Sequence, residues 1–222
     1  MPDREGRFPV VLVVQEIFGL HEHIRDICRR FAQEGYLAIA PQLYQRQGDA
    51  SQYSDIPVLI EKIVSKVPDE QVMQDLDACL VWAGLHGGDL SRVAVTGYCW
   101  GGRITWLYAA HQAKVKAGVA WYGRLVTGHG PLQKTHPIDV TDRLHAPVLG
   151  LYGGKDAGIP MADVQKMREH LHQGNEQGRA SDIHVYQDAE HAFYADYRPS
   201  YLRPAADDAW KRCLAWMDRH LG

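Results

Sequence analysis

The stretch SRVAVTGYCWGGRIT, residues 91–105, decides the fold, because an apolar run, a cysteine between glycines and the start of a helical pattern follow one another there. The motif Gly97-Tyr98-Cys99-Trp100-Gly101 is G-x-C-x-G, typical of the strand–turn–helix nucleophile elbow with cysteine in place of the more usual serine. Such a turn is so tight that a β-carbon at either glycine would collide with the neighbouring strand or helix. We therefore expect Cys99 at a helix N-terminus, with the backbone N–H of Trp100 free to bind an oxyanion. A glycine-flanked cysteine can equally be an ordinary turn residue, so the rest of the chain has to decide.

The remainder of the chain alternates short apolar runs with amphipathic segments. This alternation predicts a mostly parallel sheet with helices on both faces, in three layers. No repeat, low-complexity tract or shift in composition marks a second domain, so we expect residues 1–222 to form a single domain. The expected strands are residues 9–14, 36–40, 93–95, 117–122, 147–152 and 182–186, and the expected helices are 24–34, 57–67, 69–83, 103–110, 161–173 and 205–220.

The composition is that of an ordinary globular protein, with 45% apolar and 23% charged residues. A formal net charge of -3 gives no electrostatic reason to bind nucleic acid or an anionic membrane. No apolar run approaches the roughly 20 residues of a membrane-spanning helix. The N-terminal stretch MPDREGRFPV lacks the apolar core of a signal peptide. We therefore expect a cytoplasmic protein with neither nucleic-acid nor membrane partners.

Three of the four cysteines, Cys28, Cys79 and Cys213, fall on apolar stripes with helical spacing. We expect them to be small buried side chains rather than reactive thiols. The chain has no C-x-x-C pair and no Cys/His spacing typical of zinc, so we expect neither a metal nor an organic cofactor. Only Cys99 lies outside such a stripe, which makes it the candidate nucleophile.

An elbow nucleophile needs a base to take its proton and a carboxylate to orient that base. In the order typical of α/β-hydrolases, the nucleophile is followed by the acid and then by the histidine. Asp156 follows Cys99 directly after an expected strand, and His191 comes later, in the loop after the last strand. In parallel sheets these strand ends meet at one edge. Asp156 could instead be an ordinary turn or N-cap residue, and His191 an ordinary loop histidine.

With these residues placed, the sequence resembles the dienelactone hydrolases, a family of α/β-hydrolases with a cysteine nucleophile. The resemblance extends over nearly the whole chain, in the family's order, and implies the α/β-hydrolase fold. The matching stretches are VVQEIFGLHEHIRD at 13–26, APQLY at 40–44, GYCWGG at 97–102, WYG at 121–123, GGKD at 153–156 and AEHAF at 189–193.

The resemblance implies roles for single residues. Cys99, Asp156 and His191 match the catalytic triad, and Glu16 matches a glutamate that contacts the nucleophile and helps to remove its proton when substrate binds. A carboxylate beside the sulfur disfavours the thiolate. We therefore hypothesise that Glu16 keeps the thiol protonated until a substrate anion displaces the glutamate. The alternative is a solvated loop carboxylate.

Further roles concern substrate. The backbone N–H groups of Ile17 and Trp100 would form the oxyanion hole, and Tyr122 and Tyr44 would contact the substrate. The implied reaction opens an unsaturated lactone, 4-carboxymethylenebut-2-en-4-olide, to maleylacetate. It proceeds through an acyl-cysteine intermediate. The expected partner is thus a small ester or lactone that carries a carboxylate.

The chain departs from the family where that carboxylate is bound. Family members use one arginine in the helical region after the Leu-Tyr loop and another shortly after the histidine, and this sequence lacks both. Arg124 is the best replacement, because it lies just past a strand end. Alternatively, each replacement could be an ordinary surface charge. The other candidates are Arg46, Arg103 and Arg198.

Two further expectations concern the chain as a whole. The additional β-hairpin with which family members usually begin has no counterpart before the first strand, which suggests a shortened gene model. The alternatives to a dienelactone hydrolase are a generic carboxylesterase or thioesterase, and a redox-sensing thiol protein on a hydrolase fold. We expect a monomer or a small homo-oligomer.

Overall fold

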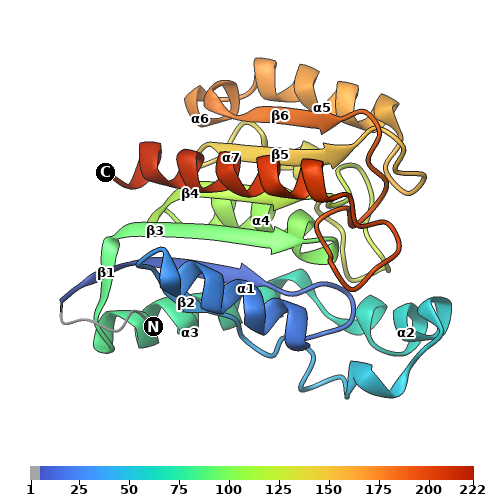
Figure 1. The fold of residues 1–222 in the computed structure, drawn as a ribbon, viewed down its shortest axis with the longest axis horizontal. Coiled ribbons are helices and arrows are strands. Elements are labelled where there is room, and N and C mark those ends of the chain that lie inside the picture. Colours follow the sequence, from blue (N-terminus) through green and yellow to red (C-terminus); the bar gives the residue numbers. More distant parts are fainter. Residues whose placement is uncertain (1–5) are drawn as a thin grey trace.

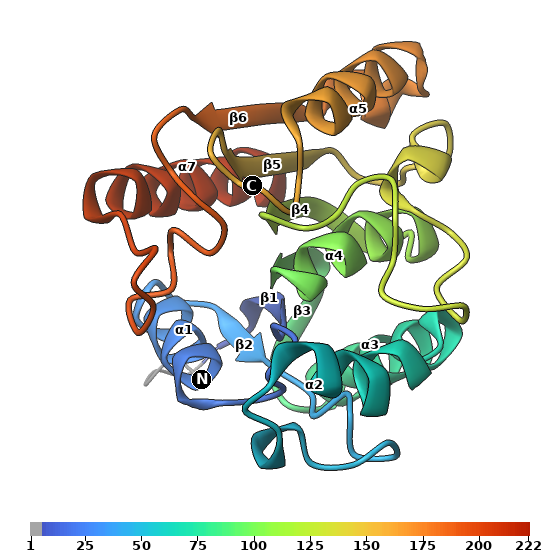
Figure 2. The same ribbon diagram turned by 90° about the vertical axis from the view of Figure 1, so that its right-hand side faces the viewer.

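The computed structural model describes residues 6–222 and contains one six-stranded sheet in the order β2-β1-β3-β4-β5-β6 (Figure 1). Each pair of neighbouring strands in it is parallel, so the carboxyl ends of the strands meet at one edge, the side that faces the viewer in Figure 2. The expected strands are confirmed to within a few residues. Their bounds are β1 Phe8–Val14, β2 Leu37–Ile39, β3 Gly88–Tyr98, β4 Val115–Trp121, β5 Val148–Gly153 and β6 Asp182–Tyr186.

The largest difference in the sheet lies in β3, which begins earlier than the apolar run predicts. The polar start of the strand pairs Gly88 with Phe8, and the register shifts at a bulge before Val10 pairs with Val93. Hydrophobic pattern does not reveal this extension, because backbone pairing rather than side-chain burial holds it.

The helices cover both faces of the sheet, as predicted. Helices α1 and α7 lie on one face, and α3, α4 and α5 lie on the other (Figures 1 and 2). Where one helix was expected at 57–67, the backbone breaks at Ile63. The bounds are α1 Glu22–Gln33, α2 Ile56–Lys62, α3 Asp69–Leu85, α4 Trp100–His111, α5 Met161–Gln173, α6 Glu176–Ala180 and α7 Arg203–Leu221, with short 3-10 turns at Ala50–Gln52, Val64–Lys66 and Pro137–Val140.

The three cysteines predicted to be buried differ in exposure. Cys213 is buried, whereas Cys28 and Cys79 are half-buried. The latter two lie on the margins of the apolar faces of α1 and α3, where spacing alone does not distinguish the centre of a stripe from its edge. The expectation of a missing N-terminal hairpin concerns the start of the chain, and residues 1–5 lie outside the described part.

Helix α4 carries a buried arginine, Arg103, that joins this helix to α3. The guanidinium of Arg103 donates to both carboxylate oxygens of Asp69 on α3, at 2.7 Å each, and to the carbonyl oxygen of Thr135. The side chain of Arg103 has no exposed surface, and that of Asp69 is 18% exposed. The pair therefore fixes α4, and the elbow at its start, against α3 and the loop that follows β4.

We expect Arg103→Met to lower the free energy of unfolding by about 3 kcal/mol, because it leaves the Asp69 carboxylate and the Thr135 carbonyl without the buried donor that they share. Urea denaturation measures this loss. The matched control is Arg46→Met, which removes a pair with Asp75 whose arginine is 54% exposed. That control should cost about 1 kcal/mol or less. Equal losses in the two variants would contradict the prediction.

Candidate active site

The elbow has the predicted geometry. Cys99 is the single residue between β3 and α4, and its backbone is in a rare conformation with φ 55° and ψ -115°. A β-carbon at Gly101 would lie 2.5 Å from the carbonyl oxygen of Val14, and one at Gly102 would lie 2.5 Å from that of Trp121. The elbow is thus packed directly against the ends of β1 and β4, and only glycine fits at these positions.

Asp156 and His191 meet beside the elbow. His191 Nδ1 donates to Asp156 Oδ2 at 2.6 Å, and the ring also makes a hydrogen bond with the side chain of Cys99. The carboxylate of Asp156 has no exposed surface and also accepts the backbone N–H of Gly158, at 2.8 Å. The two loops are joined by a hydrogen bond from Lys155 N to Ala189 O, at 2.9 Å. The loops after β5 and β6 therefore hold Asp156 and His191 next to each other.

The neighbours of His191 make its imidazole more basic. Burial lowers the pKa of this imidazole, but the sulfur of Cys99 and the hydrogen bond to Asp156 outweigh burial and raise the pKa to about 10. An imidazole that gains basicity from a nearby sulfur and a buried carboxylate is suited to accept a thiol proton and return it later.

Backbone strain gathers at the same place. In the described part of the chain, three residues other than glycine have positive φ: Cys99 at 55°, Tyr122 at 38° and Ala192 at 60°. They are the elbow residue, the residue directly after β4 and the residue directly after His191. Each such conformation costs on the order of 1–3 kcal/mol and persists only where the surrounding structure imposes it. The rim of the sheet is therefore built to hold these side chains in one arrangement.

A cavity of about 580 Å³ opens onto the elbow. Six of the nine predicted site residues line it: Cys99, Asp156, His191, Ile17, Tyr122 and Arg124. The ring of Tyr122 meets the edge of His191, with the ring centroids 5.3 Å apart. The candidate nucleophile, base and acid and the candidate substrate contacts thus line the same cavity.

The other three predicted residues lie outside the cavity wall. Tyr44 is fully buried, with its ring 5.3 Å from that of Trp100. Trp100 is buried as well, but it begins α4, so its N–H has no partner within the helix. Glu16 is fully buried, and its carboxylate is bound by His21 and Tyr197. Tyr44 therefore supports Trp100 by packing, and its predicted contact with substrate remains a proposal.

The four candidate arginines separate into two groups. Arg46 and Arg103 are paired with Asp75 and Asp69, away from the cavity. Arg124 and Arg198 both line it. Within residues 6–222 neither has a carboxylate partner, since Arg124 donates to the carbonyl oxygen of Gly128 at 2.9 Å and Arg198 lies over the ring of Phe18. Two arginines without acidic partners face one cavity.

Sequence reasoning missed several cavity residues. The most notable is His129, whose pKa is lowered to about 3 by burial and by the charge of Arg124, so that its imidazole is neutral. Its Nδ1 is buried without a hydrogen-bond partner among the described residues. It sits in a long irregular loop, where no periodicity signals which side chains point inward. The other missed residues that line the cavity include Ile56, Ile60, Glu190 and Ser200.

Residues 6–222 contain neither a cluster of metal-ligating side chains nor a membrane-spanning helix. No group of three or more His, Cys, Asp or Glu side chains there is arranged to hold a metal ion. No helix in the same range is long and apolar enough to cross a membrane.

Comparison with known proteins decides the family. The model of the dienelactone hydrolase family matches residues 1–221. This chain belongs to the dienelactone hydrolase family. A relative in Salmonella typhimurium, named "Putative carboxymethylenebutenolidase", is 56% identical over 218 residues, which cover 98% of this chain and 80% of the relative. The family and this relative make the chain a carboxylic ester hydrolase of the dienelactone hydrolase type.

Solved structures agree on the fold. A crystal structure from Klebsiella pneumoniae, described as a putative dienelactone hydrolase, is 57% identical with a TM-score of 0.94 and covers 97% of this chain and 89% of that one. An acylaminoacyl peptidase is only 15% identical, with a TM-score of 0.71 over 99% of this chain and 38% of its own length. The predicted three-layer α/β-hydrolase fold is thereby confirmed.

Proposed function

We propose that this dienelactone hydrolase family member hydrolyses a small lactone or ester that carries a carboxylate, through an acyl-cysteine intermediate on Cys99. One observation supports it above the others. The cavity that contains Cys99 and His191 also contains Arg124 and Arg198, neither of them paired with an acid in the described part of the chain. A cavity with a nucleophile at its base and two unneutralised guanidinium groups suits an anionic acyl substrate.

The proposed chemistry uses the residues in turn. The Cys99 sulfur attacks the substrate carbonyl while His191 holds the thiol proton, and the backbone N–H groups of Ile17 and Trp100 stabilise the oxyanion. The C–O bond of the lactone then breaks, and His191 returns the proton to the departing oxygen. Water, with its proton taken by His191, hydrolyses the thioester and restores the thiol. Asp156 keeps the imidazole oriented throughout.

Substitution of the two cavity arginines tests whether the substrate carries a carboxylate. We expect Arg198→Met, and separately Arg124→Met, to raise KM for 4-carboxymethylenebut-2-en-4-olide by about 10- to 100-fold, because each removes a charged hydrogen bond to the carboxylate. The same variants should hydrolyse a neutral p-nitrophenyl ester nearly as fast as the native enzyme. Loss of lactone absorbance and release of p-nitrophenol measure the two activities.

A control variant outside the cavity and the neutral ester distinguish a carboxylate-specific hydrolase from a generic carboxylesterase. Arg46→Met, whose arginine is paired with Asp75 outside the cavity, should leave both activities unchanged. If the native protein hydrolyses neutral esters as well as the carboxylate lactone, and the arginine variants affect both equally, the protein is a generic carboxylesterase and the proposed specificity is wrong.

We further infer that the chain forms one domain. The inference is supported by the single sheet of the described residues and by a family match that extends over nearly the whole sequence.

A further inference from the structure

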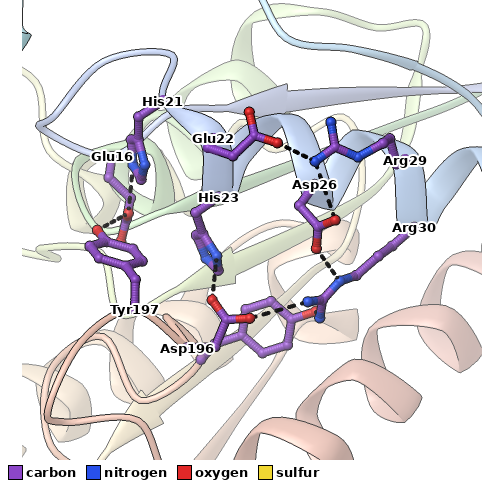
Figure 3. Close-up of polar contacts among 10 residues, drawn as sticks. Glu16, His21, Glu22, His23, Asp26, Arg29, Arg30, Asp196 and Tyr197 are labelled. Atoms are coloured by element: carbon purple, nitrogen blue, oxygen red, sulfur yellow. Dashed lines mark hydrogen bonds and ion pairs between the residues drawn. The ribbon is translucent and has the colours of Figure 1, made fainter.

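Glu16 is held by two donors from distant parts of the chain (Figure 3). Tyr197 donates its hydroxyl to Glu16 Oε2 at 2.7 Å, and His21 Nε2 donates to the same oxygen at 3.1 Å. An ionised carboxylate can only accept, so both neighbours act as donors. The other oxygen, Oε1, is buried without a hydrogen-bond partner among the described residues.

These two hydrogen bonds favour the ionised form of Glu16. Burial raises the pKa of the carboxyl, but the hydrogen bonds from His21 and Tyr197, with the charge of His23, outweigh burial and bring the pKa below its ordinary value. The side chain of Glu16 is 1% exposed, so water does not replace a lost donor readily. Without these donors, a buried carboxylate takes up a proton.

Glu16 and the elbow lie at equivalent positions on neighbouring strands. Val14, at the end of β1, pairs with Gly97 of β3, and Glu16 and Cys99 each follow two residues later. A β-carbon at Gly101 would lie 2.6 Å from the carbonyl oxygen of Gln15, so the segment that bears Glu16 packs directly on the elbow. The backbone that bears Glu16 therefore lies directly against the backbone that bears Cys99.

A second layer of ion pairs anchors the two donors. Asp196, next to Tyr197, pairs with His23 at 3.2 Å and with Arg30 at 3.3 Å, and Arg30 is itself fixed by Asp26 at 2.7 Å (Figure 3). Helix α1 thereby fastens the loop that follows β6, the loop that also carries His191. The donors are thus held in place before any ligand binds.

We propose that His21 and Tyr197 are positioning residues that keep Glu16 as a fixed, ionised carboxylate beside Cys99, where it opposes the thiolate until substrate binds. The inference rests on the proposed role of Cys99 as nucleophile and extends it to two residues that do not touch the reacting atoms. Among the described residues, His23 from α1 and Tyr122 after β4 also interact electrostatically with Glu16, and Tyr122 interacts with Cys99 as well.

The test measures the reactivity of the Cys99 thiol directly. Iodoacetamide alkylation of Cys99 is followed by mass spectrometry across pH 5–9 in the native protein, Glu16→Gln, and His21→Ala/Tyr197→Phe. Alanine has no side-chain donor, and His21 makes no side-chain cap hydrogen bond to α1, so the double variant should retain the helix. We expect Glu16→Gln to lower the midpoint pH of alkylation by about 1 unit, because a neutral side chain no longer opposes the thiolate. The double variant should reproduce this shift, and each single donor variant should give part of it.

The decisive experiment combines the two donor substitutions with Glu16→Gln. In the Glu16→Gln background, removing both donors should produce no further shift, since they act through the Glu16 charge. A donor variant with the native profile, or a donor effect that persists without the Glu16 charge, overturns the proposal. Tyr201→Phe is the matched control, because its hydroxyl lies in the same loop and bonds to none of the described residues. Alkylation needs no turnover, so this test can fail while the Cys99 hydrolase proposal stands.

Discussion

Cys99→Ala is expected to lower kcat for carboxylate lactones and p-nitrophenyl esters by at least about 10³-fold, with the fold retained. The variant removes the only group in the proposed mechanism that forms a bond to the acyl carbon. Binding and the oxyanion donors remain, so a small residual rate above the uncatalysed reaction should persist. Steady-state kinetics measures the loss, and thermal denaturation shows whether the fold is intact.

Controls for Cys99→Ala distinguish a hydrolase from a thiol sensor. Cys79→Ala removes a half-buried thiol on α3 that does not line the cavity, and it should leave kcat unchanged. A burst of product equal to the enzyme concentration, present in the native protein and absent in Cys99→Ala, reports the acyl-cysteine. If Cys99→Ala retains full turnover, the proposed nucleophile is wrong. If the native protein forms a sulfenic acid at Cys99 and hydrolyses no ester or lactone, the redox-sensor alternative is favoured.

Asp156→Asn should lower kcat by about 10³- to 10⁴-fold while KM changes little. The amide is nearly the same size, but it loses the negative charge that accepts His191 Nδ1–H at 2.6 Å. The imidazole then loses both its fixed orientation and part of its basicity. The pKa of His191, raised to about 10 in the native protein, should fall. Nuclear magnetic resonance titration of the His191 ring measures that shift independently of turnover.

The control for Asp156→Asn is Asp188→Asn. Asp188 lies in the neighbouring loop and pairs with Lys155 at the surface, at 2.9 Å, so its loss should leave kcat and the His191 titration unchanged. A native rate in Asp156→Asn, or an unchanged pKa of His191, would contradict the role proposed for this carboxylate.

The sequence alone determined the fold class and the order of its elements. Continuous apolar runs identify parallel strands buried on both faces, and the glycines around Cys99 identify the elbow, because both signals are local in the chain. The candidate triad was also predictable, since strand-end positions in a parallel sheet converge on one edge. The match to the dienelactone hydrolase family model confirms the family that these motifs indicated.

Side-chain partners were decided only by the tertiary structure. Sequence position favoured Arg124 and left Arg46, Arg103 and Arg198 as equivalent alternatives; packing places Arg46 and Arg103 in ion pairs and leaves Arg124 and Arg198 in the cavity. The donors to Glu16 were likewise invisible, because Tyr197 lies 181 residues away along the chain.

The physical reason is the same in each case. Periodicity and glycine spacing are local signals that a short window of sequence carries. The partner of a charge, and the direction in which an irregular loop turns a side chain, depend on which distant segments the sheet brings together. Local sequence therefore predicts the scaffold and the candidate nucleophile. The charges around that cysteine are arranged only when the loops after β1, β4, β5 and β6 meet at one edge of the sheet.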